Sequence, residues 1–214
     1  MTTVLEPTEA NVQRAAAAIA AGKVIVAPSD TNLGLTLDPT QPSAVERAYE
    51  IKDRPRHKPL TLFVRDPAAW HEFATHQHPA LVEDVVDEFW PGPLNLVLPA
   101  TEAVPHEQCM RSGTVSIGCL SNPVWRSLAA AVDGPLAMTS ANQSGTVEDS
   151  TLVDVDLATE HVGEEVELIL AGNAQGTTRA STILDLAADD PTIRRRGDVT
   201  AGDLAGAGIS IETV

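Results

Sequence analysis

The alternation of short apolar runs with longer helix-like segments constrains the fold most. Eight runs have the length and apolar character of strands, and helix-like stretches separate several of them. These runs are Val24–Val26, Leu60–Val64, Leu94–Leu98, Val115–Ile117, Pro135–Met138, Val166–Leu170, Ser181–Leu186 and Thr192–Arg194. Such alternation predicts an α/β protein built on a mixed sheet within one domain.

Capping residues predict where helices begin. Three of them stand directly before helix-like stretches, namely Thr8, Asp66 and Asn122. Ser43 and Glu46 have the spacing of a capping box, for a helix that ends near Lys52. A further helix is expected over residues 79–89. The Gly- and Ala-rich end of the chain is weakly patterned, so we expect a domain over 1–197 and a C-terminal tail over 198–214.

The charge balance limits the partners. Fourteen basic and thirty acidic residues give a net charge of −16, which repels nucleic acids and anionic membranes unless the cations are gathered in one place. No apolar run approaches the ~20 residues of a membrane span, and the N-terminus does not resemble a secretory signal. The two cysteines, Cys109 and Cys119, have no metal-site spacing. These features predict a cytoplasmic protein with no membrane partner and no metal site of its own.

The cations are concentrated in two short segments. Residues 47–65 hold six of the fourteen basic residues, and Arg194, Arg195 and Arg196 add three more. Converging Lys and Arg side chains are typical of a polyphosphate site. The alternative is a solvated helix end whose cations complement the helix dipole. Charge alone does not decide between them.

Small polar residues follow three of the predicted strands, at residues 28–32, 139–145 and 181–182. Hydroxyls and backbone N–H groups at strand ends cradle phosphates in many α/β proteins, although the same residues also make ordinary turns. The sequence contains neither a P-loop nor a Gly-x-Gly-x-x-Gly motif. The three segments together with the two basic clusters favour an anion site.

Five motifs occur in a characteristic order. They are Pro28-Ser-Asp-Thr31, Lys52-Asp-Arg54 leading to Lys58-Pro-Leu, Trp90-Pro-Gly-Pro-Leu, Ser140-Ala-Asn142-Gln-Ser-Gly, and Ser181-Thr-Ile-Leu-Asp. This series, which covers about residues 10–197, resembles the YrdC-like family, whose best-known members are threonylcarbamoyl-AMP synthases. The resemblance implies a single-domain α/β fold in which an open, twisted mixed sheet surrounds a positively charged cavity.

The resemblance also implies a nucleotidyltransferase reaction. Family members join L-threonine, bicarbonate and ATP into threonylcarbamoyl-adenylate, release pyrophosphate, and so supply the t6A modification of tRNA. ATP is then a substrate, and Mg²⁺ is expected to accompany it with the phosphates as its main ligands. Proteins of tRNA modification are the implied partners.

The matching motifs imply the site residues. Lys52 and Arg54 are implied to be catalytic, as electrostatic clamps on the charge that develops during phosphoryl transfer. The implied ATP-binding set is Lys52, Arg54, Lys58, Ser140, Asn142, Ser181 and Arg195. The implied amino-acid set is Thr31, Leu33, Asn95 and Gly118.

Three positions of the amino-acid set depart from the family pattern. Leu33 stands where the family has tyrosine, Asn95 where it has threonine, and Gly118 where it has arginine. Losing a charged contact leaves an anion without its partner. Either Arg111 or Arg196 reaches the same space, or the small pocket left by the three residues admits another amine or a bulkier group. We expect an altered or weakened preference for threonine.

Three functions stay open from the sequence. The first is a threonylcarbamoyl-AMP synthase, and the second is a divergent paralogue with a different amino-acid or amine acceptor. The third is a double-stranded RNA- or nucleotide-binding protein without turnover. The net charge of −16 and the scarcity of aromatic residues weaken the RNA-binding alternative.

Overall fold

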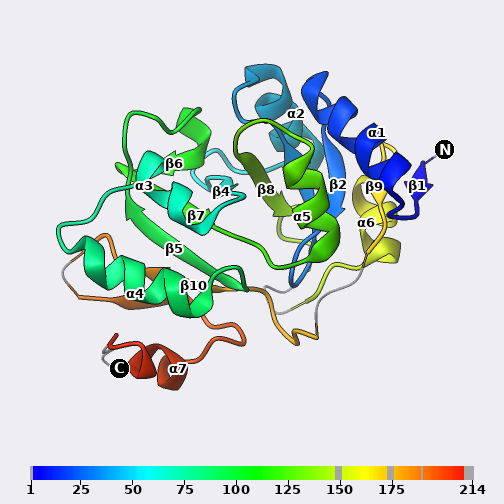
Figure 1. Cartoon of the computed structure of the whole chain (residues 1–214). Helices are drawn as coiled ribbons and strands as arrows, with labels where there is room; N and C mark the ends of the chain where they lie inside the picture. The colour runs from blue at the N-terminus through cyan, green and yellow to red at the C-terminus, as the bar shows by residue number, and fades with distance from the viewer. Residues whose placement is uncertain (1, 148–150, 173–175, 189, 210–214) are drawn as a thin grey trace.

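The chain folds around one mixed β-sheet. In the computed structural model, which describes residues 2–147, 151–172, 176–188 and 190–209, the sheet has eleven strands (Figure 1). The strands are β1 (Val4–Leu5), β2 (Ile25–Pro28), β3 (Leu33–Leu37), β4 (Thr61–Phe63), β5 (Leu94–Pro99), β6 (Met110–Arg111), β7 (Thr114–Gly118), β8 (Leu136–Ser140), β9 (Ile169–Leu170), β10 (Thr182–Asp185) and β11 (Thr192–Arg195). Their order is β1-β9-β2-β3-β8-β4-β7-β5-β10-β11, with β6 paired to β7.

The pairings confirm an open, mixed α/β sheet. The parallel pairs are β1–β9, β2–β9, β4–β7 and β5–β10, and the other pairs are antiparallel. The described sheet does not close into a barrel, because β1 and β11 stand at its two ends without pairing to each other. Strand β3 was missed from the sequence, since its Leu-Gly-Leu-Thr-Leu run directly follows a segment expected to be a polar loop.

Seven α-helices and two 3₁₀ turns are described. They are α1 (Glu9–Ala20), α2 (Pro42–Lys52), α3 (Trp70–Phe73), α4 (Pro79–Phe89), α5 (Pro123–Ala130), α6 (Val155–Val162), α7 (Ala201–Gly206), η1 (Pro67–Ala69) and η2 (Glu107–Cys109). The caps at Thr8, Asp66 and Asn122 are confirmed, because each side chain accepts a backbone N–H of its first turn. The capping box at Ser43 is wrong: α2 begins one residue earlier, at Pro42, and its N-cap Gln41 makes no side-chain cap bond.

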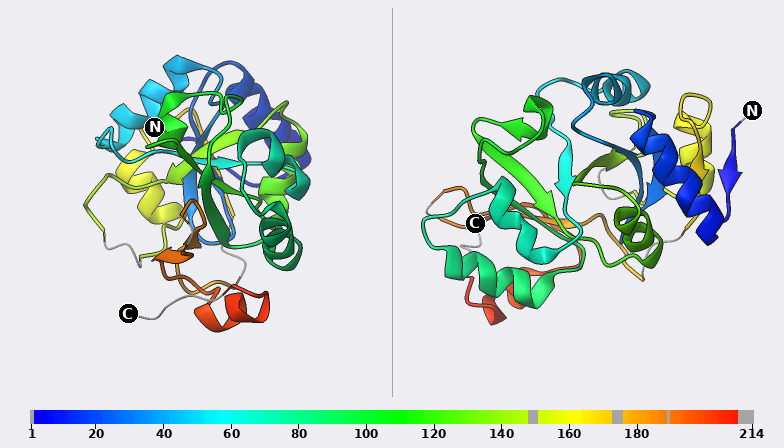
Figure 2. Two further views of the ribbon diagram at one scale, coloured as in Figure 1. Left: turned by 90° about the vertical axis from the view of Figure 1, so that its left-hand side faces the viewer. Right: turned by 45° about the horizontal axis from the view of Figure 1, so that its top comes forward.

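The helices complete two hydrophobic clusters. Helices α1 and α5 pack against each other and against β2, around Ile19 and Trp125 (Figure 2). A larger cluster gathers buried residues of α2, α4 and the strands. The tail contributes to this larger cluster, because Leu204 on α7 and Ile209 beyond it are buried there. A capping box between Thr200 and Asp203 begins α7, while residues 210–214 of the expected tail lie outside the described residues.

The strand register aligns residues from four strands in one row. Phe63 pairs with Gly118, Gly118 with Asn95, and Asn95 with Ile183. In a sheet, residues of one such row share a face, and residues two positions along each strand share it too. The row therefore brings β4, β7, β5 and β10 to the same surface, and this surface carries the site.

Candidate active site

A cavity of about 740 Å³ lies on one face of the sheet. Alternate residues of the strands line it: Thr61 and Phe63 of β4, Asn95 and Val97 of β5, Thr114 and Ser116 of β7, and Ile183 and Asp185 of β10. The intervening leucines and isoleucines face the core instead. Loops contribute Ser29, Thr31, Asn32 and Lys58, and strand β6 contributes Arg111. Period-two alternation thus gives each strand one cavity side and one core side.

The charged groups of the lining are mostly basic. Five cations line the cavity: Arg54, Lys58, Arg111, Arg194 and Arg195. The one carboxylate of the lining, Asp185, forms an ion pair of 2.9 Å with Arg194. In a protein with a net charge of −16, this cavity therefore gathers cations as a polyanion would require.

The backbone that follows α2 fixes Arg54. Asp53, in the left-handed conformation with φ of 48°, ends the helix and turns the chain toward the cavity. Arg54 then donates from Nε to Lys58 O at 3.0 Å and from Nη2 to Pro59 O at 2.7 Å. These two bonds hold the plane of the guanidinium, and burial lowers its pKa. A planar group held in this way suits phosphate oxygens.

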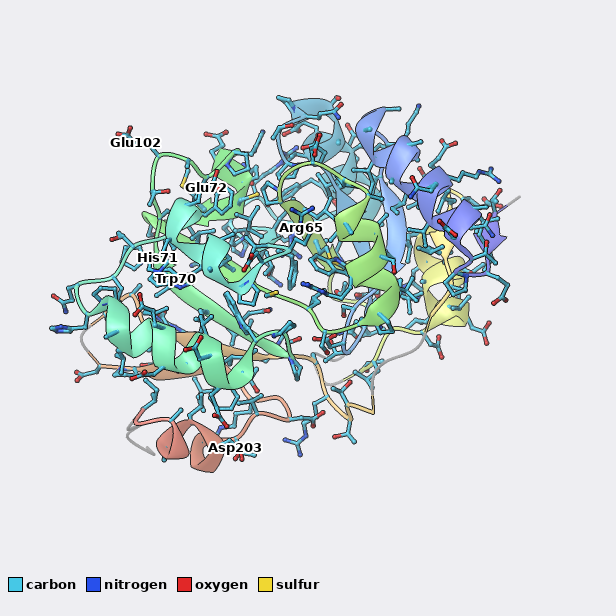
Figure 3. All side chains as sticks on the ribbon, in the orientation of Figure 1. Arg65, Trp70, His71, Glu72, Glu102 and Asp203 are labelled. Atoms are coloured by element: carbon cyan, nitrogen blue, oxygen red, sulfur yellow. The ribbon has the colours of Figure 1, made fainter. Side chains whose placement is uncertain are left out.

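Only two of the six cations in residues 47–65 line the cavity by their own side chains. Arg47 pairs with Glu165, and Arg56 pairs with Glu46, both at exposed positions. Arg65 lies beside α5, where its carbonyl accepts a hydrogen bond from Arg126 (Figure 3). The sequence cluster thus mixes two cavity residues, Arg54 and Lys58, with cations of surface ion pairs. Composition alone could not tell the two groups apart.

Lys52 lies behind the cavity wall. Its side chain is 1% exposed, and Nζ donates to the backbone carbonyls of Ser140 and Asn142 and to Ser140 Oγ at 3.4 Å. In return, Ser144 N donates to Lys52 O at 2.9 Å. Lys52 therefore ties the end of α2 to the loop after β8, and Ser140 is the member of this cluster that lines the cavity. Asn142 is buried and donates to Gln143 O, so it does not line the cavity in this structure.

Burial has shifted the titration of Lys52. It lowers the pKa of the ammonium to about 7, and the nearby cations Arg54 and Lys58 lower it further in the same direction. A polyanion in the cavity would oppose all of these causes, because an opposite charge favours the protonated form. The protonation state of Lys52 is thus linked to occupancy of the cavity.

Hydroxyl groups from distant segments meet at another part of the cavity. Thr31 Oγ1 lies 3.5 Å from Ser181 Oγ, and both side chains are nearly buried. Arg195 donates from Nε to Ser181 O at 2.8 Å, which fixes this arginine beside the hydroxyl pair. The structure therefore brings together Thr31 of the expected amino-acid set with Ser181 and Arg195 of the expected ATP-binding set.

Asp30 holds this part of the cavity in place, although the motifs implied no role for it. Its carboxylate accepts hydrogen bonds from the backbone of Ser121 and Asn122 and from Ser121 Oγ, at 2.6–3.0 Å. Burial raises the pKa of the Asp30 carboxyl, and these hydrogen bonds oppose the rise. Asp30 is a positioning residue that fixes the Thr31 loop against the beginning of α5.

Two of the expected amino-acid residues lie away from the cavity surface. Leu33 is 2% exposed and packs in the main core, because its neighbours Asn32 and Gly34 occupy the cavity side of the chain. Its expected place in a substrate pocket is therefore wrong. Gly118 also lies beneath the surface, since a Cβ there would come within 2.6 Å of Asn95 Oδ1 and 2.8 Å of Phe63 Cε1. Phe63 and Asn95 fill the space, so the expected small pocket is not present.

Phe63 and Arg111 are cavity residues that the ligand sets implied by the motifs did not include. Arg111 reaches the cavity from the β6–β7 hairpin, as one of the two alternatives for the absent arginine. Arg196, the other, is exposed and does not line the cavity. Only the strand register could have revealed Phe63, because it pairs with Gly118 across β4 and β7.

The described residues offer little to a metal ion. No group of three or more His, Cys, Asp or Glu side chains among them could hold one. Asp185, the carboxylate of the cavity lining, is already paired with Arg194. A Mg²⁺ ion brought by a nucleotide would therefore depend on the phosphates for its charged ligands. In the described part of the chain, no helix is long and apolar enough to cross a membrane.

Comparisons with known proteins point to one family. The sequence model of the Sua5/yciO/yrdC family, described as "Telomere recombination", matches residues 17–197. The threonylcarbamoyl-AMP synthase of Pseudomonas putida KT2440 is 34% identical over 176 residues, which are 82% of this chain and 92% of the relative. The threonylcarbamoyl-AMP synthase of Vibrio campbellii is 28% identical over 82% of this chain and 94% of that relative.

Solved structures show the same fold. The crystal structure of P. abyssi Sua5 complexed with L-threonine superposes with a TM-score of 0.87 at 27% identity, over 99% of this chain. This chain spans 62% of the length of that protein. E. coli YciO, at 23% identity and a TM-score of 0.80, covers 95% of this chain and supports the fold alone.

Proposed function

The chain belongs to the Sua5/YciO/YrdC family, and we propose that it is a threonylcarbamoyl-AMP synthase. The enzyme would form threonylcarbamoyl-adenylate from ATP, bicarbonate and L-threonine, as a nucleotidyltransferase that releases pyrophosphate. The observation that carries the proposal is Arg54, whose guanidinium is fixed by two backbone carbonyls inside a cavity lined by five cations. The named synthases that match most of this chain support the same reaction.

The chemistry needs positioning more than a protein nucleophile. The amine of threonine adds to bicarbonate, loses water and becomes a carbamate. A carbamate oxygen then attacks the α-phosphorus of ATP, a new P–O bond forms, and the bond to the β-phosphate breaks as pyrophosphate leaves. Two anions must be held against each other while charge on the phosphorus centre and leaving group is stabilised.

The cavity residues divide into roles for this reaction. We assign the phosphates of ATP to Arg54, Lys58 and Arg195, with Ser140 Oγ as a hydrogen-bonding group beside them. Lys52 acts through Ser140 and Asn142, because its ammonium holds the backbone of both residues. Lys52 and Asn142 are thus positioning residues of the nucleotide site in this proposal, and Ser181 closes the site next to Arg195.

Further parts of the proposal follow from the reaction. ATP would enter with Mg²⁺, whose charged ligands are the phosphates. The product would pass to enzymes of tRNA modification, in the cytoplasm. Direct RNA binding is disfavoured by the net charge of −16, since counterion release requires an accessible basic surface.

Pyrophosphate release tests the proposal directly. The full chain is incubated with MgATP, bicarbonate and L-threonine, and then with each component omitted in turn. We expect release that requires all three components, and a product of the mass of threonylcarbamoyl-adenylate. Pyrophosphate release that does not require the amino acid, or that only another amine supports, would contradict the proposal and indicate a divergent paralogue. Binding of ATP without release would indicate a nucleotide-binding protein.

A further inference from the structure

Asn95 carries an unsatisfied amide in the cavity. Its side chain is 4% exposed and lines the cavity, yet Oδ1 is buried without a hydrogen-bond partner. A buried polar atom without a partner is unfavourable, and native proteins retain few of them. The amide is therefore arranged for something other than stability, and the amide nitrogen is the polar atom left to face the cavity.

Gly118 explains the orientation of this amide. The position where a Cβ would stand on Gly118 lies 2.6 Å from Asn95 Oδ1, so the amide oxygen occupies space that any other residue would need. The ring of Phe63 closes the same space from the other side, at 2.8 Å from that position. Asn95, Gly118 and Phe63 form one unit, which we call the neutral row, and its members pair directly across β5, β7 and β4.

The neutral row adds no charge to the cavity, in contrast to the five cations of the lining. Its members carry no charge, and the next residue of the same row, on β10, is Ile183. The phosphates of a nucleotide are better served by Arg54 and Lys58, which follow α2. A single amide donor instead suits one oxygen of a carboxylate, where it gives direction without the charge of an arginine.

We propose that Asn95 holds the carboxylate of the amino-acid substrate, by donating from Nδ2 to one of its oxygens, in place of the arginine that the family pattern leads one to expect at Gly118. This inference rests on the proposed function, because it names a group that holds the amino acid of that reaction. The row keeps its glycine because a larger residue at 118 would displace the amide. The side chain that recognises the carboxylate thus comes from β5, and it lies beside Gly118 of β7, which has no side chain of its own.

Kinetics of three variants tests the assignment. Asn95→Ala removes the donor, Asn95→Asp replaces it with a negative charge of the same shape, and Asn95→Thr restores a shorter donor. A hydrogen bond to a charged group contributes about tenfold to a hundredfold in affinity. We expect the KM for L-threonine to rise by about that factor in Asn95→Ala, further in Asn95→Asp, and least in Asn95→Thr. The KM for ATP should stay within about twofold.

A matched control separates this role from a structural one. Gln13→Ala removes an exposed carboxamide on α1 and should leave every parameter unchanged. The melting temperature of Asn95→Ala should stay within a few degrees, because the lost oxygen had no partner. An increase in the KM for ATP or for bicarbonate, with that for threonine unchanged, would overturn the assignment. Equal KM values for threonine in all variants would do so too.

A measurement of threonine binding without turnover tests this inference separately from the proposed function. L-Threonine is titrated calorimetrically into the wild-type chain and into Asn95→Asp, in the presence of MgATP. Binding to the wild type that the variant loses would support the role of Asn95, even if no pyrophosphate is released and the proposed reaction fails. Equal binding to both would refute the role of Asn95 and leave the reaction standing. Absence of threonine binding to the wild type would overturn both.

Discussion

The segment Lys52–Pro59 and the neutral row contribute to the same cavity by opposite means. In this segment Arg54 donates hydrogen bonds to two backbone carbonyls and Lys52 donates to two others, so main-chain acceptors orient both charged groups. The neutral row has no charge, and its shape comes from the side chains of Phe63 and Asn95, which meet over Gly118 across the strands. The difference teaches that a cation can be positioned locally within one segment, whereas a neutral recognition surface depends on the register of the whole sheet.

The largest expected effect separates two arginines of the cationic segment. Arg54→Ala should weaken ATP binding by about 1.5–3 kcal/mol, roughly tenfold or more, because it removes a charge-assisted contact. Arg56→Ala is the matched control, since Arg56 pairs with Glu46 at the surface and does not line the cavity. Calorimetric titration of ATP measures both. Equal losses in the two variants would mean that net charge, and not the orientation of Arg54, determines binding.

A substitution at Gly118 tests whether the neutral row is a closed unit. Gly118→Arg restores the residue type that the resemblance leads one to expect, but its Cβ would collide with Asn95 and Phe63. We expect the KM for threonine to rise, and the free energy of unfolding to fall by about 1–3 kcal/mol, as for other overpacked sites. Steady-state kinetics and urea unfolding measure the two. Improved threonine use in this variant would contradict the closed row and support a missing arginine.

The pH dependence of ATP binding probes the buried end of the cationic segment. In the free protein the pKa of Lys52 is about 7, lowered by burial and by its cationic neighbours. A bound polyanion raises this pKa, so ATP binding should take up protons above pH 7, and the affinity should decrease as pH rises through that range. Titrations in two buffers with different ionisation enthalpies measure the uptake. Lys52→Met should abolish this component, and an uptake that persists in this variant would assign it to another group.

Ser140 gives the smallest expected change in stability. Its Oγ lines the cavity and receives only a long bond of 3.4 Å from Lys52, whereas its backbone carbonyl carries the stronger tie. Ser140→Ala should thus leave the melting temperature within a few degrees while turnover decreases. Thermal unfolding and pyrophosphate release on the same preparation measure this. A large melting shift with unchanged turnover would make Ser140 a structural residue.

Local chemistry explains what the sequence could predict. Residue type and spacing predicted the mixed α/β sheet, the caps at Thr8, Asp66 and Asn122, and the concentration of cations around Arg54. The residues of a helix cap or of a charge cluster lie within a few positions of one another, so the linear sequence shows them directly. The error at Ser43 arose because Pro42 fits the first turn of a helix without a side-chain cap.

Register explains what the sequence could not predict. Three features depend on residues that are distant in the chain. Leu33 faces the core, Phe63 fills the space beside Gly118, and the ammonium of Lys52 turns to backbone carbonyls. A shift of one position would exchange the faces of a strand, so a motif match gives the residue but not the side of the sheet that it serves. Asp30 was overlooked for the same reason, because its partners lie 91 and 92 residues away.

The crossed kinetic comparison of Arg54→Ala and Asn95→Asp tests the central claim most directly. Both KM values, for ATP and for L-threonine, are measured for the wild type and the two variants by pyrophosphate release. The account predicts that Arg54→Ala raises the KM for ATP, whereas Asn95→Asp raises that for threonine, each by about tenfold or more with the other changed little. Parallel changes of both parameters in both variants would contradict the division of the cavity into a cationic nucleotide side and a neutral amino-acid side.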